Sequence, residues 1–378
     1  MGPSYNVHVD VDLDFVSKSV EFLEGEFGNL VGDPKWTDEL LLWKLSDVNP
    51  SGKGILVVAE IDGKIIATAS LTLKRMIVDG KEVLGGEIGD TYSAEKSRRL
   101  AVPKALIETN QDASHYVNKS LFGRLVSEII NHAATIQCEI IYGTPNANSL
   151  PGYVKKLQFF EIQGYKNVSR SRPTSLFIKV KAPLPRIILE VVIPVISKLS
   201  YLYRSLILLL FRPKNLIVKS LLASDEDIDS LWRDCLPSKG FSLIRDSKYY
   251  NYRYRDHPLE KYNHHAFYID GKLACMLTTC IKTDSNGNSV VVICDYLKNN
   301  KISFLYLLNY IVDSHAHLSV LKYNFWCEEY GQDFMSAMFS GFIGGSSVPI
   351  IFCNSNKTLG LAATSLKMDF HVGSSDNV

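Results

Sequence analysis

Two carboxylates interrupt a segment that otherwise consists of glycine, isoleucine and hydroxyl residues. Glu87 and Asp90 lie in the string "GGEIGDTY" (85–92), which has the character of a β-strand. Because side chains alternate along a strand, Glu87 and Thr91 are predicted on one face and Ile88 and Asp90 on the other. Burying a carboxylate is costly unless it is paired or used in chemistry. Either carboxylate could therefore accept a proton from a nucleophile, directly or through water, or instead pair with a core arginine or cap a loop.

A second polar cluster follows the apolar run "CEIIY" (138–142). The string "GTPNANSLPGYVKKLQFF" (143–160) predicts a turn and then a short helix from about residue 149 to residue 157. Its amide and hydroxyl side chains at the turn are Asn146, Asn148 and Ser149. They could bind polar groups of a ligand, or serve as ordinary turn and cap residues.

Upstream of this cluster, "NKSLFGRLVSEIINHAATIQ" (118–137) predicts an amphipathic helix, because apolar residues recur at helical spacing. A helix N-terminus offers backbone N–H groups and a positive dipole end, which suit a diphosphate. The residues that would form this turn are Val117, Asn118, Lys119, Ser120 and Leu121. The alternative is a core helix that binds no ligand.

The elements that would position these groups follow a definite order in the first half of the chain. A strand and two helices precede three antiparallel strands joined by "DG" turns, and then come helix, strand, short helix and two closing strands. The predicted ranges are 5–11, 14–28, 36–45, 54–93, 118–137, 138–142, 149–157, 159–168 and 174–180.

This order resembles the GNAT fold of acyl-CoA-dependent N-acyltransferases, over about residues 5–181. "WKLSDVNPSGKGILVVAEIDGKIIATAS" resembles the early strands, and "GGEIGDTYSAE" the central strand that lines the active site. "YVNKSLFGRLVSEIINHA" resembles the pyrophosphate loop with its helix, and "YGTPNANSLPGYVKKLQFFEI" the Asn-bearing turn and the helix after it. The turn at 117–120 departs from the family's Arg- and Gly-rich pattern, but backbone amides do the binding there.

The resemblance implies acyl-CoA as a co-substrate, no metal, and a role for several residues. Coenzyme A would contact the turn at 117–121, and the pantetheine amides or a water near the sulfur would contact Asn146, Asn148 and Ser149. Glu87 or Asp90 would take the proton of an amine. The family's usual tyrosine position falls on Val154, so either Tyr153 protonates the thiolate from a shifted turn or no side chain does.

Residues 93–117 form an insertion where the family usually has only a few residues. The insertion carries Arg98, Arg99, Lys104 and His115. Such a basic loop could cover an anionic acceptor, while a solvated surface loop is the alternative. We expect acceptor contacts from Thr91, Tyr92 and His115.

The second half repeats the pattern more faintly. Strings that resemble the early helix and strands, the central strand and the main helix of a second GNAT unit lie at 246–281, 290–299 and 302–318. Because no Gly-rich or basic turn precedes the last of these, we expect this half to lack coenzyme A and to shape the acceptor site. In "KYYNYRYR" (248–255), Tyr252, Arg253 and Arg255 could stack a base and hold phosphates, or belong to a packing helix.

We therefore predict a mixed α+β protein of two GNAT-like units, each a mixed, mostly antiparallel twisted sheet flanked by helices. The predicted boundaries are 1–181, an apolar helical linker at 182–212, and a degenerate second unit at 213–378. The linker sequence at 183–211 is strongly apolar but interrupted by charges. We expect one or two helices packed between the units or against another subunit, and a helix lying on a membrane surface is the alternative.

Composition limits the function further. The 378 residues carry a net charge of +1, which argues against a nucleic-acid partner. Seven scattered cysteines lack a zinc pattern, so free thiols in a reducing cytosol are expected. The first residues lack an apolar signal core, which favours a cytoplasmic protein.

The whole pattern resembles tandem-GNAT proteins of bacterial surface-polysaccharide assembly. The leading hypothesis is an acyl-CoA-dependent N-acyltransferase acting on the amine of a dTDP- or UDP-linked amino sugar. Peripheral membrane contact through 183–211 and a homodimer are further expectations. The alternatives are a tRNA-dependent aminoacyltransferase of the same tandem type and a non-enzymatic scaffold on a membrane surface.

Overall fold

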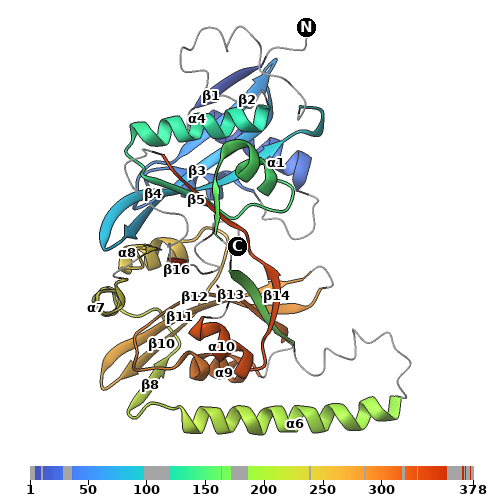
Figure 1. Ribbon diagram of the computed structural model, residues 1–378, viewed down its shortest axis with the longest axis vertical. Coiled ribbons are helices and arrows are strands. Elements are labelled where there is room, and N and C mark those ends of the chain that lie inside the picture. Colours follow the sequence, from blue (N-terminus) through green and yellow to red (C-terminus); the bar gives the residue numbers. More distant parts are fainter. Residues whose placement is uncertain are drawn as a thin grey trace.

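The chain folds into two units stacked along the long axis of the molecule, each built on one β-sheet (Figure 1). This computed structural model describes residues 5–9, 12–28, 36–97, 120–162, 164–171, 186–237, 240–284, 287–316, 320–329, 331–355, 368–369, 371 and 375. Helices flank both sheets, and one long helix lies in the chain between two strands of the second sheet. The predicted mixed α+β class with two sheet-and-helix units is confirmed.

The first sheet contains nine strands, of which seven form the path β1-β2-β3-β4-β5-β15-β6. Strand β9 pairs with the far part of β3, and β16 pairs with β9. The pair β4 and β5 runs parallel in the middle of the path. The bounds are β1 (Asn6–Val9), β2 (Ile55–Ile61), β3 (Lys64–Val78), β4 (Lys81–Ser93), β5 (Ile140–Gly143), β6 (Phe160–Ile162), β9 (Phe241–Leu243), β15 (Ile350–Asn354) and β16 (Met368–Asp369).

The second sheet contains seven strands in the order β14-β7-β13-β12-β11-β10-β8. Its only parallel pair among the described strands is β12 with β13. Like β4 and β5, these two strands are joined through a helix. The bounds are β7 (Tyr165–Ser171), β8 (Leu216–Lys219), β10 (Asn263–Ile269), β11 (Lys272–Thr283), β12 (Ser289–Lys298), β13 (Val320–Glu328) and β14 (Ile343–Ser347).

The two sheets exchange strands, which the predicted boundaries did not anticipate. Strand β7 comes from the first half of the chain but lies between β13 and β14 of the second sheet. Strand β15 comes from the second half but lies between β5 and β6 of the first sheet. The division at 181 and 213 therefore follows the chain order but not the composition of the sheets. The expected closing strand at 174–180 falls outside the described residues.

Helices cover both faces of the first sheet. Helix α4 (Leu121–Thr135) packs one apolar stripe, including Leu125, Val126 and Ile129, against the odd-numbered residues of β2 and β3. Helices α1 (Leu13–Phe27) and α2 (Asp38–Leu45) pack against the opposite face through the alternate residues of β2. The apolar stripes of the helices thus pack against the alternating apolar residues of the strands, as the sequence pattern predicted.

The second unit repeats this layered arrangement. Helices α9 (Phe304–Ser314) and α10 (Gln332–Phe339) lie on one face of its sheet. Helices α7 (Asp225–Cys235) and α8 (Ser247–Tyr250), with the π-helical turn η5 (Asn251–Arg255), lie on the other face, toward the first unit (Figure 1).

The two predicted "DG" turns close hairpins of the first sheet. Asp62 and Gly63 have φ angles of 48° and 77°, and Asp79 and Gly80 have φ angles of 46° and 81°. Positive φ at both central residues matches the right-handed twist of the flanking strands. These turns fix the antiparallel register of β2 with β3 and of β3 with β4.

The linker is one helix, α6 (Arg186–Leu210), and it does not pack between the units. It runs along the outer side of the second unit, at the end farthest from the first sheet (Figure 1). It contacts α9, and most of its apolar side chains from Val191 onward are exposed. The helix is therefore not packed between the units, whereas packing against another subunit, the other part of that expectation, stays a prediction.

Candidate functional site

The central strands of the first sheet separate at a defined point. Strand β4 pairs in parallel with β5 from Gly85 opposite Ile140 to Glu87 opposite Tyr142. Strand β5 ends at Gly143, whereas β4 continues to Ser93 while pairing with β3. The described part of β5 offers no partner to the end of β4. Beyond Glu87 and Tyr142 the two strands are therefore no longer paired with each other.

A β-bulge in β4 re-aims the side chains at this point. Ser70 of β3 lies opposite Gly89 and Thr68 lies opposite Tyr92, so two residues of β4 oppose Ala69 alone. Asp90, the first of the two, has a φ angle of 44°. The extra residue breaks the strand alternation. The bulge therefore places Asp90 on the face of Glu87 and turns Thr91 to the face of Ile88, contrary to the predicted alternation.

Asp90 is buried in a network that satisfies its charge. Its carboxylate accepts hydrogen bonds from Lys44 Nζ at 2.6 Å, Ser70 Oγ at 2.7 Å and Trp36 Nε1 at 3.2 Å. Burial opposes ionisation, but the Lys44 charge and these hydrogen bonds outweigh it and lower the pKa of Asp90. A carboxylate with a lowered pKa is a weak proton acceptor. The geometry therefore favours a structural role for Asp90, the alternative that the sequence left open.

Glu87 lies on the same face in a looser ion pair. Its Oε2 is 3.7 Å from Nζ of Lys74, and both side chains are buried. Lys74 also lines a recess between the two units, so the ion pair connects Glu87 with that recess. Of the two carboxylates, Glu87 is the better placed to exchange a proton with a molecule lying between the units.

Tyr153 lies on the opposite face of β4, beside Thr91. It belongs to the π-helical turn η3 (Gly152–Lys156), and its hydroxyl is 3.0 Å from Thr91 Oγ1. The rings of Phe122 and Phe159 pack edge-on against it. Burial raises the pKa of Tyr153, against a smaller lowering by the Thr91 hydrogen bond. The hydroxyl is therefore neutral at physiological pH and can donate a proton.

The wider π-turn explains how Tyr153 reaches this position. The sequence alignment placed the expected tyrosine at Val154, one residue later. A π-helical turn accommodates an extra residue and often occurs at functional sites. The structure brings Tyr153 and Thr91 together, as a shifted turn requires.

The N-terminus of α4 lies beside Tyr153. Ser120 caps the helix by accepting a hydrogen bond from the Gly123 amide at 3.3 Å, and Leu121 is fully buried. Phe122, in the first turn, contacts the Tyr153 ring. The first amides of α4 thus begin near the end of β4, where a diphosphate could bind. Four further predicted site residues, Val117, Asn118, Lys119 and His115, lie outside the described residues.

The asparagine cluster builds its own turn. Asn146 Oδ1 accepts hydrogen bonds from the amides of Asn148 and Ser149, both at 3.0 Å. Ser149 Oγ donates to Asn146 as well. These contacts support the turn-and-cap interpretation of the three residues. The turn carries the chain from β5 into η3 and so positions Tyr153. Tyr92, the remaining β4 candidate, stacks near Phe27 and Trp36, away from η3.

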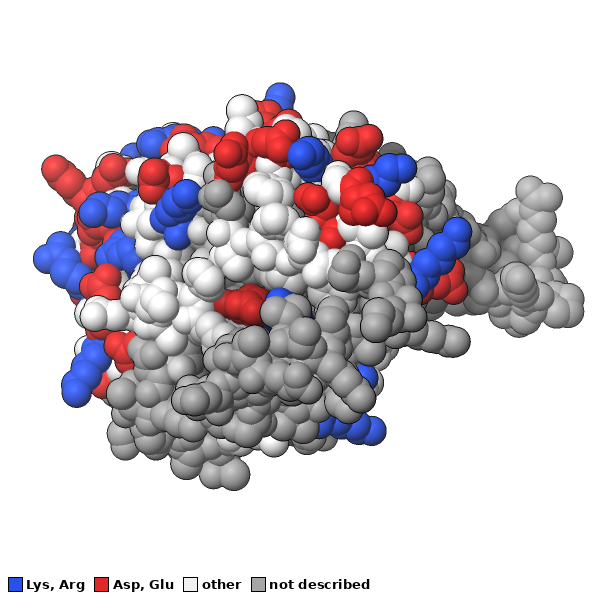
Figure 2. Space-filling view, turned by 90° about the horizontal axis from the view of Figure 1, so that it is seen from above, with Lys and Arg blue, Asp and Glu red and all other residues white. Residues whose placement is uncertain are grey.

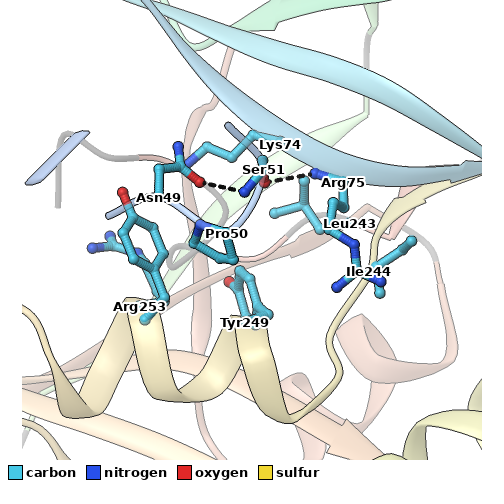
Figure 3. Close-up of a pocket in the computed structure, with 10 residues that line it drawn as sticks. Asn49, Pro50, Ser51, Lys74, Arg75, Leu243, Ile244, Tyr249 and Arg253 are labelled. Carbon is cyan, nitrogen blue, oxygen red and sulfur yellow. Dashed lines mark hydrogen bonds between the residues drawn. The ribbon is translucent and has the colours of Figure 1, made fainter. Parts of the chain in front are cut away.

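A small recess, partly open to solvent, lies between the units (Figure 3). One wall is Asn49, Pro50, Ser51, Lys74 and Arg75 of the first unit, and the other is Leu243, Ile244, Tyr249, Tyr252 and Arg253. In Figure 3, Tyr249 and Arg253 rise from the helix of the second unit toward Pro50 and Asn49. The predicted residues Tyr252 and Arg253 thus reach an inter-unit site.

The three predicted residues Tyr252, Arg253 and Arg255 do not all line the recess. Tyr252 stacks on Trp43 with ring centroids 4.4 Å apart, and its hydroxyl donates to the Trp43 carbonyl. Arg253 is 1% exposed and donates to the Ser375 carbonyl at 2.8 Å. Arg255 is exposed and pairs with Asp256, its neighbour in sequence. Arg255 therefore does not share the recess.

Several residues of the site were missed by sequence reasoning. Lys44 and Lys74 are buried partners of the two carboxylates, and Ser375 bridges the units by bonding both Arg253 and Thr144. Lysines inside the apolar strings "LLLWKL" and "SLTLKRMIV" were a signal, because a lysine is rarely buried unless paired. Nothing in the sequence around Ser375 indicated this role. The described residues contain no cluster of His, Cys, Asp and Glu suited to a metal ion.

The geometry can be compared with known proteins. No protein-family model and no curated protein matches the sequence. A GCN5-related N-acetyltransferase from Anabaena variabilis aligns with a TM-score of 0.57 at 10% identity, covering 93% of this chain and 74% of that one. A probable N-acyltransferase of unknown function from Enterococcus faecalis aligns with a TM-score of 0.58 at 12% identity, covering 93% and 73%.

N-myristoyltransferase from Saccharomyces cerevisiae, solved with bound myristoyl-CoA and inhibitors, is similar over the same extent. It aligns with a TM-score of 0.58 at 14% identity, covering 94% of this chain and 81% of that one. At these identities the likeness concerns the fold. The chain therefore shares its fold with these proteins.

Proposed function

We propose that this protein is an acyl-CoA-dependent N-acyltransferase whose first unit binds coenzyme A and performs the chemistry. The observation that carries the proposal is the Tyr153–Thr91 contact beside the separation of β4 and β5, next to the N-terminus of α4. A proton donor, two diverging strands and a helix N-terminus together suit an extended thioester. The shared fold with N-acyltransferases supports the same conclusion.

The proposed reaction is transfer of an acyl group from the coenzyme A sulfur to an amine. The neutral amine attacks the thioester carbonyl, the C–N bond forms, and the C–S bond breaks. The amine loses one proton, to Glu87 or to water held near it, and the departing thiolate gains one from Tyr153. Backbone amides at the end of β4 would stabilise the oxyanion that forms in between. The products are an amide and coenzyme A.

We further propose that the acceptor is a nucleotide-linked amino sugar, carried on dTDP or UDP, in surface-polysaccharide assembly in the cytoplasm. Support comes from the recess between the units, where Lys74 and Arg253 bring positive charge and Tyr249 and Tyr252 bring aromatic rings. Phosphates and a base require such groups. The acceptor amine would approach β4 from the side of Glu87.

A tRNA acceptor has no comparable support. Figure 2 shows the molecule from above in the orientation of Figure 1. Among the described residues on this face, acidic and basic side chains are interspersed and form no broad basic surface. Affinity for a nucleic acid depends on neutralising many phosphates. We therefore do not propose tRNA-dependent transfer.

Calorimetric titration with coenzyme A tests the proposal first. We expect one site per chain with micromolar affinity, followed by thiol release when acyl-CoAs are screened against nucleotide-linked amino sugars. Two sites per chain would show that the second unit also binds coenzyme A. Absence of binding would overturn the proposal. Binding and thiol release with simple amines, but not with nucleotide sugars, would retain the acyl transfer and overturn the acceptor.

Substitutions at the two carboxylates test the proton acceptor. We expect Glu87→Gln to lower kcat at neutral pH, with recovery at higher pH as free amine and hydroxide become available. Asp90→Asn is expected to affect stability more than kcat per folded molecule. Normal turnover in Glu87→Gln would mean that water alone takes the proton.

A further inference from the structure

Helix α6 has its polarity inverted relative to a water-facing helix. Its protein-facing side is a narrow stripe that includes Ile193, Arg204 and Ile207, each less than a tenth exposed. The other side points away from the second unit, at the end of the molecule (Figure 1). That outward side is almost wholly apolar: Val191, Leu199, Leu202, Leu206, Leu209 and Leu210 are each at least half exposed.

Three polar side chains of α6 form hydrogen bonds with the protein instead. Ser200 Oγ accepts a hydrogen bond from Arg170 at 3.0 Å, and Arg204 Nε donates to Asp313 at 3.1 Å. Tyr203 donates to the carbonyl of Phe339 at 2.9 Å. A helix on the surface of a soluble protein normally shows the opposite distribution, with its apolar stripe inward. The sequence of α6 therefore fits an apolar medium on its outer side.

The apolar surface continues beyond α6. The Tyr203 hydrogen bond joins the helix to the end of α10, where Phe339 is 62% exposed. Met335 and Met338 of α10 are also exposed. Contiguous exposed apolar surface of this kind marks an interaction site.

The exposed charges along the described part of α6 and just after it are positive. Between Val191 and Asn215 the sequence contains no acidic residue. Lys198, Arg212 and Lys214 are exposed there, while Arg204 is buried in its pair with Asp313. Exposed lysine and arginine beside an apolar helix complement the negative headgroups of a membrane surface.

We propose that α6 docks this protein on the surface of an anionic lipid bilayer, lying in the plane of the membrane. The width of the apolar side favours lipid over a second protein. A partner helix covers one stripe, whereas a bilayer surface covers the whole outward arc. The exposed lysine and arginine residues beside the helix independently favour an anionic bilayer. This docking is separate from acyl transfer and would hold the acceptor site near the membrane.

The helix would lie on the membrane and not cross it. Val191–Leu210 is long and apolar enough to span a bilayer, with 17% of that window buried inside the protein. However, Ser200 and Arg204 tie its middle to Arg170 and Asp313 of the second unit. A spanning helix would break these contacts and leave Arg204 in the hydrocarbon, which is costly.

Flotation of the full-length protein with vesicles tests the proposal. We expect it to float with vesicles of phosphatidylcholine and phosphatidylglycerol, and to float far less with phosphatidylcholine alone. Leu202→Glu and Leu206→Glu should each lower the partition coefficient at least about tenfold. Lys198→Glu and Arg212→Glu should each lower it about fivefold on the anionic vesicles only.

Leu259→Glu is the matched control, because Leu259 is a comparably exposed leucine (42%) outside α6. It should float like the unaltered protein, and thermal unfolding should show that all variants are folded. A protein that ignores both kinds of vesicle overturns the proposal, and so does a soluble dimer that Leu202→Glu dissociates. If the membrane-bound protein resists carbonate extraction, α6 spans the bilayer, and the proposed in-plane arrangement is overturned.

Discussion

At the scale of single residues, the Tyr153 hydroxyl has one specific task in the proposed reaction. Because burial raises its pKa, it stays protonated throughout the neutral range and can protonate the departing thiolate. We expect Tyr153→Phe to lower kcat about 100-fold, with little change in the KM for acyl-CoA. Steady-state kinetics by thiol release would measure both constants. The unaltered enzyme should show no loss of rate from ionisation of Tyr153 below about pH 10.

Thr91 supplies the control for that prediction. Its hydroxyl holds the Tyr153 hydroxyl at 3.0 Å, so Thr91→Ser should keep most of the activity and Thr91→Val should lose part of it. Both replacements preserve the strand. Equal activity of Tyr153→Phe and the unaltered protein would show that the thiolate departs without a side-chain acid.

The buried pair of Asp90 and Lys44 gives a prediction about stability. Asp90→Asn keeps the shape and tolerates the positive φ, but it leaves Lys44 buried without its anion. We expect the free energy of unfolding to fall by about 3 kcal/mol in urea titrations at pH 7. The exposed pair of Asp14 and Lys18 is the control, and Asp14→Asn should cost less than about 0.5 kcal/mol.

The pH dependence of that difference follows from the lowered pKa of Asp90. A lowered pKa means that the carboxylate contributes stability above its unfolded-state value of about 4. The contribution disappears as the pH falls through the folded-state value. The stability gap between the unaltered protein and Asp90→Asn should therefore be constant near neutrality and close in acid. A gap that persists at pH 2 would contradict the ion-pair explanation.

The sequence identified some of these residues and not their partners. The glycine-rich strand and the turn after β5 pointed to Thr91 and Tyr153 separately, and the structure brings these two side chains into contact. The predicted alternation failed at Asp90, since a bulge inserts one residue and strand patterns contain no sign of it. The ion pair with Lys44 joins α2 to β4 across a long stretch of chain. Such a contact depends on tertiary packing and not on spacing.

At the scale of elements, Gly143 allows β4 and β5 to approach before they separate. A Cβ atom there would lie 2.9 Å from Ile88 Cγ2 and 3.1 Å from the Ile88 carbonyl oxygen. We expect Gly143→Ala to lower the free energy of unfolding by about 1–3 kcal/mol and to weaken coenzyme A binding, because the strands must move apart. Urea unfolding and calorimetry would measure the two effects.

Gly25 provides the contrast for this prediction. It lies in α1, and a Cβ atom there would meet nothing within 4 Å. Gly25→Ala should raise the stability by about 0.5–1 kcal/mol, because alanine favours the helix, and should leave coenzyme A binding unchanged. Similar behaviour of the two variants would show that Gly143 does not control the strand separation.

The order of elements was predictable because each element has a strong local pattern. The stripe of α4 and the two "DG" hairpins lie where periodicity and turn chemistry placed them. The π-helical form of η3 was not predictable, since the same residues satisfy an α-helical pattern equally well. Its consequence, a tyrosine one residue from the expected position, was nevertheless visible in the sequence.

At the scale of the whole molecule, the exchange of β7 and β15 joins the two units into one structure. Each strand is short and pairs with strands remote in sequence, so its sheet cannot be inferred from its own residues. The register shows it directly: Val168 of β7 pairs with Phe325 and Gly344, and Ile351 of β15 pairs with Gly143 and Glu161. Neither sheet is complete without a strand from the other half of the chain.

This exchange predicts how the halves behave when they are separated. A fragment of residues 1–212 retains β7 without its partner strands and lacks β15, and residues 213–378 have the opposite defect. We expect each fragment alone to aggregate, because unpaired strands and apolar faces are exposed. Co-expressed fragments should form a one-to-one complex that unfolds in a single cooperative transition. If residues 1–212 alone gave a soluble monomer with cooperative unfolding, β15 would be dispensable, and the two units would be independent domains instead of one interlocked fold.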